Sequence, residues 1–342
     1  MLNVSLFFFQ APTWTQNKPS TFRLGPTTLT EEVDFKTARY SGSGNVTAAL
    51  VQVTTCDGFD SAKDKIALVP DVSDASDPLC SLYNRTLLAE QAEALGVVVY
   101  STRQGSGPSW PRIRTNDWLP TDTFATIPVL TVGSVLGEVL AATTQTAAMV
   151  VDATNTISPT FNVIAETTAG DEESILIVGA HLDSVAAGPG INDNGSGAAA
   201  LLSMVNVMVA KSITPTNKIR FCWWGAEEEG LVGSRSYVRS LIDPKTRMPD
   251  RRVKANLNFD MLASPNGVHF VYNGSTAPYP ANLTSPALQQ AFEGFFTASK
   301  LPYEVIPFST TGGSDYYPFI YSGTRALLSP GPCCRVAWLH DR

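Results

Sequence analysis

The pattern of apolar and polar positions divides the chain near residue 146. Before that point, short β-branched runs bounded by Gly, Pro, Asp or Ser predict strands at 46–53, 65–70, 96–102 and 127–133. Residues 83–95 instead carry apolar side chains at helical spacing and stop at Gly96, which predicts one helix. Residues 1–24 predict an apolar strand at 4–9 and then a polar turn. We therefore expect a small β-rich domain over residues 25–145.

After residue 146, apolar runs of strand length alternate with longer runs of helical length. The predicted strands are 174–184, 253–262, 267–273, 303–308 and 325–329, residues 217–230 predict a further strand that runs into a polar loop, and the predicted helices are 197–211, 231–242 and 286–300. Strands that alternate with helices indicate an α/β domain whose central sheet is largely parallel or mixed and is flanked by helices. We assign this second domain to residues 146–342.

Composition and charge limit the classes of partner. The formal net charge is −7, and charged residues make up only 16% of the 342 residues, so binding to nucleic acid or to an anionic membrane is not expected. The most apolar stretch, residues 198–210, is too short to span a bilayer. The first residues lack the basic segment and cleavage site of a signal peptide.

Other features point to the secretory pathway. The glycosylation candidates are Asn3, Asn45, Asn84, Asn273 and Asn282; a sixth Asn-x-Ser/Thr sequence, at Asn194, lies in a loop where a glycan would be awkward. The five cysteines are Cys56, Cys80, Cys222, Cys333 and Cys334. Cys56 and Cys80 lie near turns and could pair, whereas Cys222 lies in an apolar run typical of a buried thiol. These features predict that the sequence begins inside a longer, secreted or vacuolar protein.

Polar side chains follow three of the strands predicted in the second domain. His181 and Asp183 end the first, Glu227 and Glu228 the second, and Asp260 the third. Functional sites in α/β sheets form beyond the carboxyl ends of the strands, so these side chains are expected to converge at one edge. A further acid, Asp193, lies in the Gly-rich loop before the first helix of this domain. One imidazole with several carboxylates is a plausible zinc site.

Four motifs in this domain resemble the M28 family of zinc aminopeptidases. They are VGAHLDSVAAGPGINDNGSGAAALL, RFCWWGAEEEGLVGS, LNFDML and GGSDYYPF. The preceding region resembles the protease-associated (PA) domain that some members carry as an insert, through VTAALVQVTTCDGFD and AEALGVVVYST. The resemblance implies a Cys56–Cys80 disulfide, and it makes residues 1–24 a remnant of the peptidase fold before the insert.

The resemblance also implies roles for individual residues. His181 and Asp260 would bind one zinc, Asp193 would bridge two zincs, and Glu228 would bind the second. Glu227 would be the general base, and Asp183 would accept a hydrogen bond from His181 and fix its orientation. Asp315, in GGSD, would help to shape the substrate pocket. The expected substrates are peptides or proteins with a free N-terminus, and we expect the chain to act as a monomer.

The sequence departs from the family near its end, where the family carries a further His ligand. Only His269 and His340 remain as candidates, and the apolar alternation around His269 favours a structural role for it. We therefore expect a chain shortened at both ends, with an incomplete second zinc site and impaired activity. Two alternatives stay open: another enzyme of this fold, such as a carboxypeptidase or glutaminyl cyclase, and a non-catalytic protein whose PA domain mediates protein contacts.

Overall fold

The structure divides into two compact units. The computed structural model describes residues 2–71, 80–115, 119–143, 145–246, 248–265, 267–308 and 313–322, and the backbone of 326–330. Unit 1 consists of Met1–Ala11 and Pro159–Arg342, and unit 2 of Pro12–Ser158. Strands β1 (Leu2–Leu24) and β8 (Thr146–Thr167) run without a break through residues of both units. The expected boundaries after residues 24 and 145 therefore fall within unit 2.

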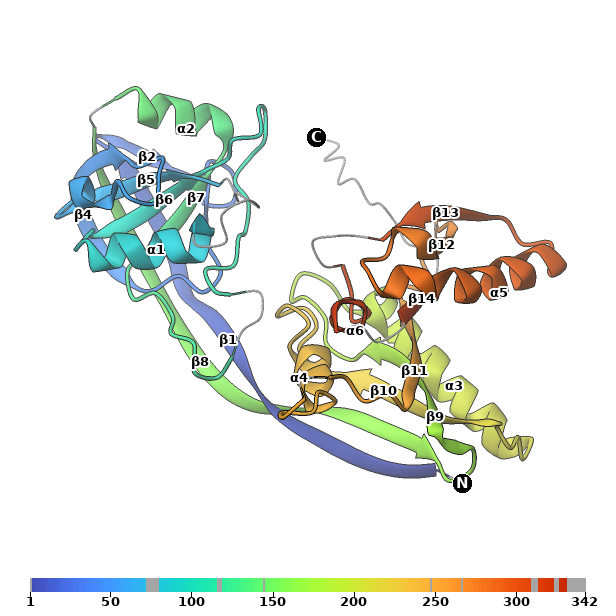
Figure 1. Ribbon diagram of the computed structural model, residues 1–342. Coiled ribbons are helices and arrows are strands. Elements are labelled where there is room, and N and C mark those ends of the chain that lie inside the picture. Colours follow the sequence, from blue (N-terminus) through green and yellow to red (C-terminus); the bar gives the residue numbers. More distant parts are fainter. Residues whose placement is uncertain are drawn as a thin grey trace. The chain divides into compact units, whose positions relative to one another are not determined.

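Unit 1 contains a mixed sheet with a parallel centre (Figure 1). Its order is β14 (Ala326–Pro330), β11 (Val253–Asp260), β9 (Asp171–His181), β10 (Asn217–Trp224) and then β8. The first four strands are mutually parallel, and β8 is antiparallel to β10. The carboxyl ends of β9, β10 and β11 thus meet at one edge, as the α/β pattern predicts.

Alternating side chains of these strands bury two opposite faces. On one face, Val178, Phe221 and Trp223 pack with Leu201 of α3 (Gly197–Ala210). On the other, Ile177, Cys222 and Trp224 pack with side chains of α4 (Val232–Ser240) and α6 (Tyr317–Tyr321). The sheet is therefore covered by helices on both sides, which confirms the predicted α/β class. Cys222 is buried and free of any disulfide, as its apolar surroundings predict.

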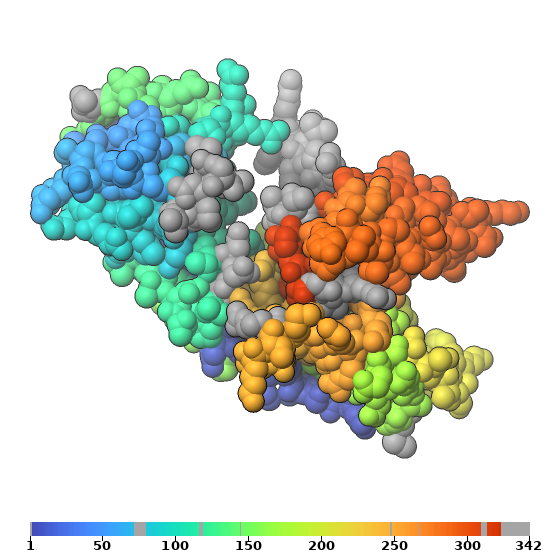
Figure 2. Space-filling model, viewed as in Figure 1, coloured from blue at the N-terminus to red at the C-terminus, as the bar shows by residue number. Residues whose placement is uncertain are grey.

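A smaller two-stranded parallel sheet completes unit 1. It pairs β12 (His269–Asn273) with β13 (Tyr303–Pro307), and α5 (Ser285–Ala298) packs on β12. In the space-filling view these segments form one continuous orange lobe (Figure 2).

Unit 2 is built on a second run of strands. The order continues from β8 through β4 (Gly44–Gln52), β5 (Ile66–Pro70), β6 (Gly96–Tyr100), β7 (Val129–Val132) and β3 (Phe35–Thr37). Strand β2 (Thr27–Leu29) pairs with the end of β1. Helix α1 (Leu82–Gln91) packs on one face of the sheet and α2 (Ser134–Ala141) on the other.

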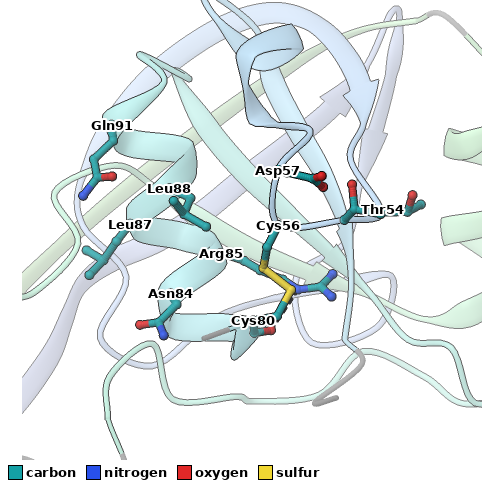
Figure 3. A pocket seen from close by; sticks show the side chains of 10 residues that line it. Thr54, Cys56, Asp57, Cys80, Asn84, Arg85, Leu87, Leu88 and Gln91 are labelled. Carbon is teal, nitrogen blue, oxygen red and sulfur yellow. Dashed lines mark hydrogen bonds between the residues drawn. A yellow bond between two sulfur atoms is a disulfide. The ribbon is translucent and has the colours of Figure 1, made fainter. Parts of the chain in front are cut away.

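Cys56 and Cys80 form a disulfide in unit 2. The disulfide lies at a pocket of about 800 Å³ between α1 and the segment around Thr54–Asp57 (Figure 3). Arg85 of α1 also lines this pocket; its side chain is almost fully buried, and its Nε donates to the carbonyl oxygen of Cys80 at 3.1 Å. This disulfide agrees with the pairing that the resemblance implies.

Two local predictions for this part of the chain are wrong. The first strand does not stop at Phe9 but continues to Leu24 through Pro12 and Pro19. Over much of its length β1 borders only β8, and proline is tolerated in edge strands because one side of the strand makes no ladder bonds. The region also contains a second helix, α2, which the sequence pattern did not reveal.

The Asn-x-Ser/Thr sites differ in exposure. Asn3 and Asn45 are exposed, and Asn84, Asn273 and Asn282 are partly buried. Asn194 is buried and engaged in hydrogen bonds, which agrees with its exclusion as a glycosylation candidate. Among the described residues, no helix combines the length and apolar character needed to cross a membrane.

Candidate active site

The site forms where the three parallel strands end. β9 ends at His181, β11 ends at Asp260, and the loop after β10 carries Glu227 and Glu228. One ligand atom from each of His181, Glu227 and Asp260 lies within 4.8 Å of the others. Asp193 approaches from the segment before α3, with Oδ1 at 3.1 Å from the His181 Nε2. Residues far apart in sequence thus converge as the strand-end argument predicts.

The surroundings of His181 require a positive charge, from a proton or a metal ion, between its ring and the carboxylates. The ring Nδ1 lies 2.9 Å from the main-chain oxygen of Asp183, a bond in which only the nitrogen can donate. In a neutral ring, Nε2 is then an acceptor, yet it faces the carboxylate oxygens of Asp193 at 3.1 Å and Asp260 at 3.3 Å. Three acceptors at such distances repel unless a proton or a metal ion lies among them.

Burial and hydrogen bonding shift the pKa of His181 in opposite directions. Burial alone would lower this pKa, but the hydrogen bonds to Asp193 and Asp260 outweigh burial and raise it. A divalent cation would replace the proton and neutralise the carboxylates. Imidazole nitrogen with carboxylate oxygens is a donor set that zinc accepts, so these residues fit such an ion.

Asp183 contacts both the glutamate loop, through its carboxylate, and the imidazole of His181, through its main-chain oxygen. Its carboxylate accepts hydrogen bonds from the backbone N–H groups of Glu227 at 2.9 Å and Glu228 at 3.0 Å. The hydrogen bond from His181 goes to its main-chain oxygen instead, and the carboxylate lies 3.8 Å from the ring. Asp183 therefore orients His181 as expected, but through its backbone, because its side chain is engaged by the loop.

Negative charge accumulates around the two glutamates. Burial is the largest cause that raises the pKa of Glu227 well above its usual range, and repulsion from Asp315 is the second largest. Burial and then the charge of Asp193 raise the pKa of Glu228. Neighbouring carboxylates repel one another when all of them are ionised. A divalent cation bound among them would offset this repulsion.

Asp315 lies deeper than the sequence suggested. It is fully buried, and burial raises its pKa to about 7. The charge of Asp315 raises the pKa of Glu227, and a part for Asp315 in shaping the substrate pocket stays a prediction.

The loop that carries Asp193 is fixed by its neighbour Asn194. The amide of Asn194 donates to the main-chain oxygen of Phe259 at 2.9 Å and accepts from the N–H of Gly197 at 2.9 Å. A Cβ at Gly197 would lie 2.4 Å from both the Asn194 side chain and the Phe259 oxygen. The NGSG sequence is therefore a packing requirement that ties the Asp193 loop to β11.

Two supporting residues escaped the sequence reasoning. Ser314 donates to Asp260 Oδ2 at 2.6 Å, and Asn258 donates in turn to the Ser314 hydroxyl at 2.7 Å. Both are buried. The only available signal was their place beside recognised acids, Ser314 before Asp315 and Asn258 two residues before Asp260.

The remaining histidines do not enlarge the described site. His269 lies on β12, where its Nδ1 donates to the Pro302 oxygen at 3.0 Å and its ring packs on Phe296. This structural setting agrees with the role favoured from its sequence. His340, Cys333 and Cys334 lie outside the described residues.

The chain is similar in sequence to known peptidases. Residues 162–341 match the model of peptidase family M28. The chain is 36% identical over 308 residues to a probable leucine aminopeptidase 2 of Aspergillus fumigatus, covering 86% of this chain and 58% of that protein. It is 45% identical over 179 residues to an aminopeptidase of Pseudomonas aeruginosa, covering 51% of this chain and 32% of that protein. The chain thus spans between about one third and three fifths of the length of these relatives.

Solved structures share the fold over nearly the whole chain. An aminopeptidase from Aneurinibacillus sp. strain AM-1 superposes with a TM-score of 0.74 at 25% identity, covering 96% of this chain and 75% of that one. A zinc aminopeptidase from Bacillus subtilis gives 0.60 at 24% identity, covering 96% and 74%. The arrangement of strands and helices is therefore one that known aminopeptidases adopt.

Proposed function

The chain belongs to peptidase family M28, and from this premise we propose that it carries the centre of a zinc-dependent aminopeptidase. The observation that carries the proposal is the His181 Nε2, which faces carboxylate oxygens of Asp193 and Asp260 at 3.1 and 3.3 Å. A carboxylate oxygen of Glu227 lies within 4.8 Å of the ligand atoms of His181 and Asp260. The names of the relatives, both aminopeptidases, support the same reaction class.

We assign the ligands as follows. His181 and Asp260 would hold one zinc, Asp193 would bridge to a second, and Glu228 would bind that second ion. Among the described residues the second ion has only these two carboxylates, so we expect it to be held more weakly than the first. When bound, zinc would polarise the scissile carbonyl and lower the pKa of water at the site.

Glu227 is proposed as the general base. As water attacks the carbonyl carbon, a carboxylate oxygen of Glu227 takes the proton and later delivers it to the amine nitrogen as the C–N bond breaks. Without a metal ion, burial raises the pKa of Glu227; a divalent cation at the site would favour the ionised carboxylate, which is the form that accepts the proton. Asp315 contributes to this raised pKa, and Asp183 holds the loop on which the base lies.

The remaining expectations concern the whole protein. We propose that unit 2 is a PA domain, that the protein is secreted or vacuolar and monomeric, and that Asn3 and Asn45 are its most accessible glycosylation sites. Mass spectrometry of the protein from a secretory host, before and after glycosidase treatment, would test the last point.

Enzyme assays would test the reaction. The full chain, equilibrated with zinc, would be given leucine peptides with free or blocked N-termini and a peptide with N-terminal Gln. Slow release of leucine from the free N-terminus alone, lost with a chelator and restored by zinc, is the expected result, because the second zinc site is expected to be incomplete. Activity on the blocked peptide would indicate a carboxypeptidase, and cyclisation of the Gln peptide a glutaminyl cyclase. Absence of all three, in a folded chain that binds zinc, would favour the non-catalytic alternative.

A further inference from the structure

One buried asparagine of β8 contacts both ends of the loop that carries the two glutamates. Asn162 is fully buried. Its Oδ1 accepts from the N–H of Gly225 at 2.9 Å, and its Nδ2 donates to the carbonyl oxygen of Gly233 at 3.0 Å. Gly225 directly follows β10 and Gly233 lies at the start of α4. A single side-chain amide therefore closes the segment that contains Glu227 and Glu228.

The closed segment needs such support because its backbone is strained. Between the two contacts, Ala226 has a φ of +56° and Leu231 a φ of +62°. Non-glycine residues adopt this left-handed region at a cost in free energy and persist there only where the surrounding structure fixes them. Asp183 fixes the middle of the loop through the N–H groups of Glu227 and Glu228, but it does not touch its ends.

The two ends of the loop pack closely around the Asn162 amide and leave no room for a side chain at Gly233. A Cβ at Gly233 would lie 2.4 Å from Asn162 Oδ1 and 2.3 Å from the Gly225 oxygen. The ends also bond directly, since the N–H of Gly233 donates to the Gly225 oxygen at 3.1 Å. The two glycines let the strand end and the helix start approach each other, and the amide of Asn162 fills the position between them.

From this geometry we propose that Asn162 is a positioning residue for catalysis: its amide holds the Gly225–Gly233 loop closed and so sets the position of Glu227. It touches no reacting atom and acts only through the loop. The proposal rests on the proposed function for its kinetic consequence, but the closure of the loop can be measured without any activity.

The test compares Asn162→Ala with Ile164→Ala in the full chain. Ile164 lies two residues further along β8, is also buried and belongs to the core on the α4 side of the sheet. Both variants lose buried contacts, so a general loss of stability affects both, whereas only Asn162→Ala removes the two hydrogen bonds to the loop.

Hydrogen exchange gives the first readout. Asn162→Ala should speed exchange of peptides that cover 225–233 by about tenfold or more relative to the other sheet segments, because the loop opens locally. Ile164→Ala should show no selective effect there. If Asn162→Ala does not fold, Gly233→Ala disturbs the same contact from the other side and should give the same local signature. Unchanged exchange at 225–233 in the folded variant would overturn the proposal.

Kinetics give the second readout. With zinc supplied, Asn162→Ala should lower kcat by about 10- to 100-fold with KM changed less than about threefold, as expected when a catalytic group is displaced by roughly 1 Å. In a Glu227→Gln background, Asn162→Ala should cost less than about threefold more, since its effect passes through Glu227. A full loss in that background would overturn the proposal. An inactive parent chain would instead refute the proposed function, with the exchange result still deciding the role of Asn162.

Discussion

Three consecutive glutamates, Glu227 to Glu229, have the same chemistry in the sequence but different surroundings in the fold. The backbone N–H groups of Glu227 and Glu228 donate hydrogen bonds to the carboxylate of Asp183. A carboxylate oxygen of Glu227 lies within 4.8 Å of the ligand atoms of His181 and Asp260. The charge of Asp193 raises the pKa of Glu228. This difference in position is consistent with the proposal that Glu227 is the base and Glu228 a ligand.

This separation predicts different outcomes for the same substitution. Glu227→Gln should lower kcat by about 10³-fold and leave zinc bound, because it removes the proton acceptor but no assigned ligand. Glu228→Gln should lose the more weakly held zinc. Glu229→Gln is the matched control and should change kcat less than about threefold. Turnover and zinc content of the three purified variants would check this, and wild-type turnover by Glu227→Gln would exclude Glu227 as the base.

The buried Asp315 predicts a pH-dependent stability of the metal-free chain. Its folded pKa, about 7, lies above the reference value of 3.8, so folding is penalised once the unfolded carboxyl ionises. Stability should fall as pH rises from about 4 to about 7 and then level off. Asp315→Asn should remove this loss, a gain of about 4 kcal/mol at pH 8 for about three pKa units.

Denaturant unfolding at pH 4 and pH 8, with zinc chelated, would measure this effect. Asp250→Asn is the contrast, because hydrogen bonds from Arg252 lower the pKa of Asp250 and its contribution should be present at pH 8 and fade in acid. An equal effect of Asp315→Asn at both pH values would contradict the assignment.

The residues of the candidate site were predictable from the sequence where the sheet topology brings strand ends together. His181, Asp193, Glu227 and Asp260 meet because parallel strands end at one edge, which the alternation of strands and helices already implies. Asn162 and Ser314 were not predictable, because a buried polar residue in a strand or loop has no sequence signature: only the fold shows which backbone group or carboxylate it contacts.

At the scale of elements, the end of β11 depends on the segment before α6. Ser314 lies in that segment, between Asp260 and Asn258 in a buried chain of hydrogen bonds of 2.6 and 2.7 Å. The hydroxyl fixes Asp260 Oδ2 and leaves Oδ1 directed at His181. The orientation of a proposed ligand is thus set by an element distant in sequence.

Ser314→Ala should therefore weaken zinc binding by about 10- to 100-fold, the usual cost of losing a partner that orients a ligand. Competition with a chelating dye would measure the change. Ser240→Ala is a suitable control, since its hydroxyl bonds only to the Tyr237 oxygen within α4 and should leave affinity unaltered. Equal affinities of the two variants would argue against this role for Ser314.

Elements were predicted well where burial sets a clear period and poorly where it does not. α3 and the parallel strands have long apolar runs, and the structure confirms them within a few residues. β1 and β8, of 23 and 22 residues, show no regular alternation of buried and exposed residues and contain prolines, so neither full strand was evident. α2 is short, and it contains Gly137, which packs against Tyr100. Its sequence therefore shows no clear helical pattern.

At the scale of the whole molecule, the two units have separate stabilising features. The core clusters of Trp224 and Phe221 belong to unit 1, and those of Tyr40 and Phe22 to unit 2. The proposed zinc centre lies in unit 1 and the disulfide in unit 2. A ligand stabilises the part of the chain that binds it, and a disulfide stabilises the segment it closes.

We therefore expect two unfolding transitions in calorimetry, each responding to one perturbation. A chelator should lower only the transition of unit 1, because zinc binds its folded form. Replacing Cys56 and Cys80 by Ala should lower only that of unit 2, by about 3 kcal/mol for a loop closed over 24 residues. Zinc content and kcat should then be unchanged in the cysteine variant. If both transitions moved together under either perturbation, the units would form one cooperative structure, and the stability of the catalytic centre would depend on unit 2.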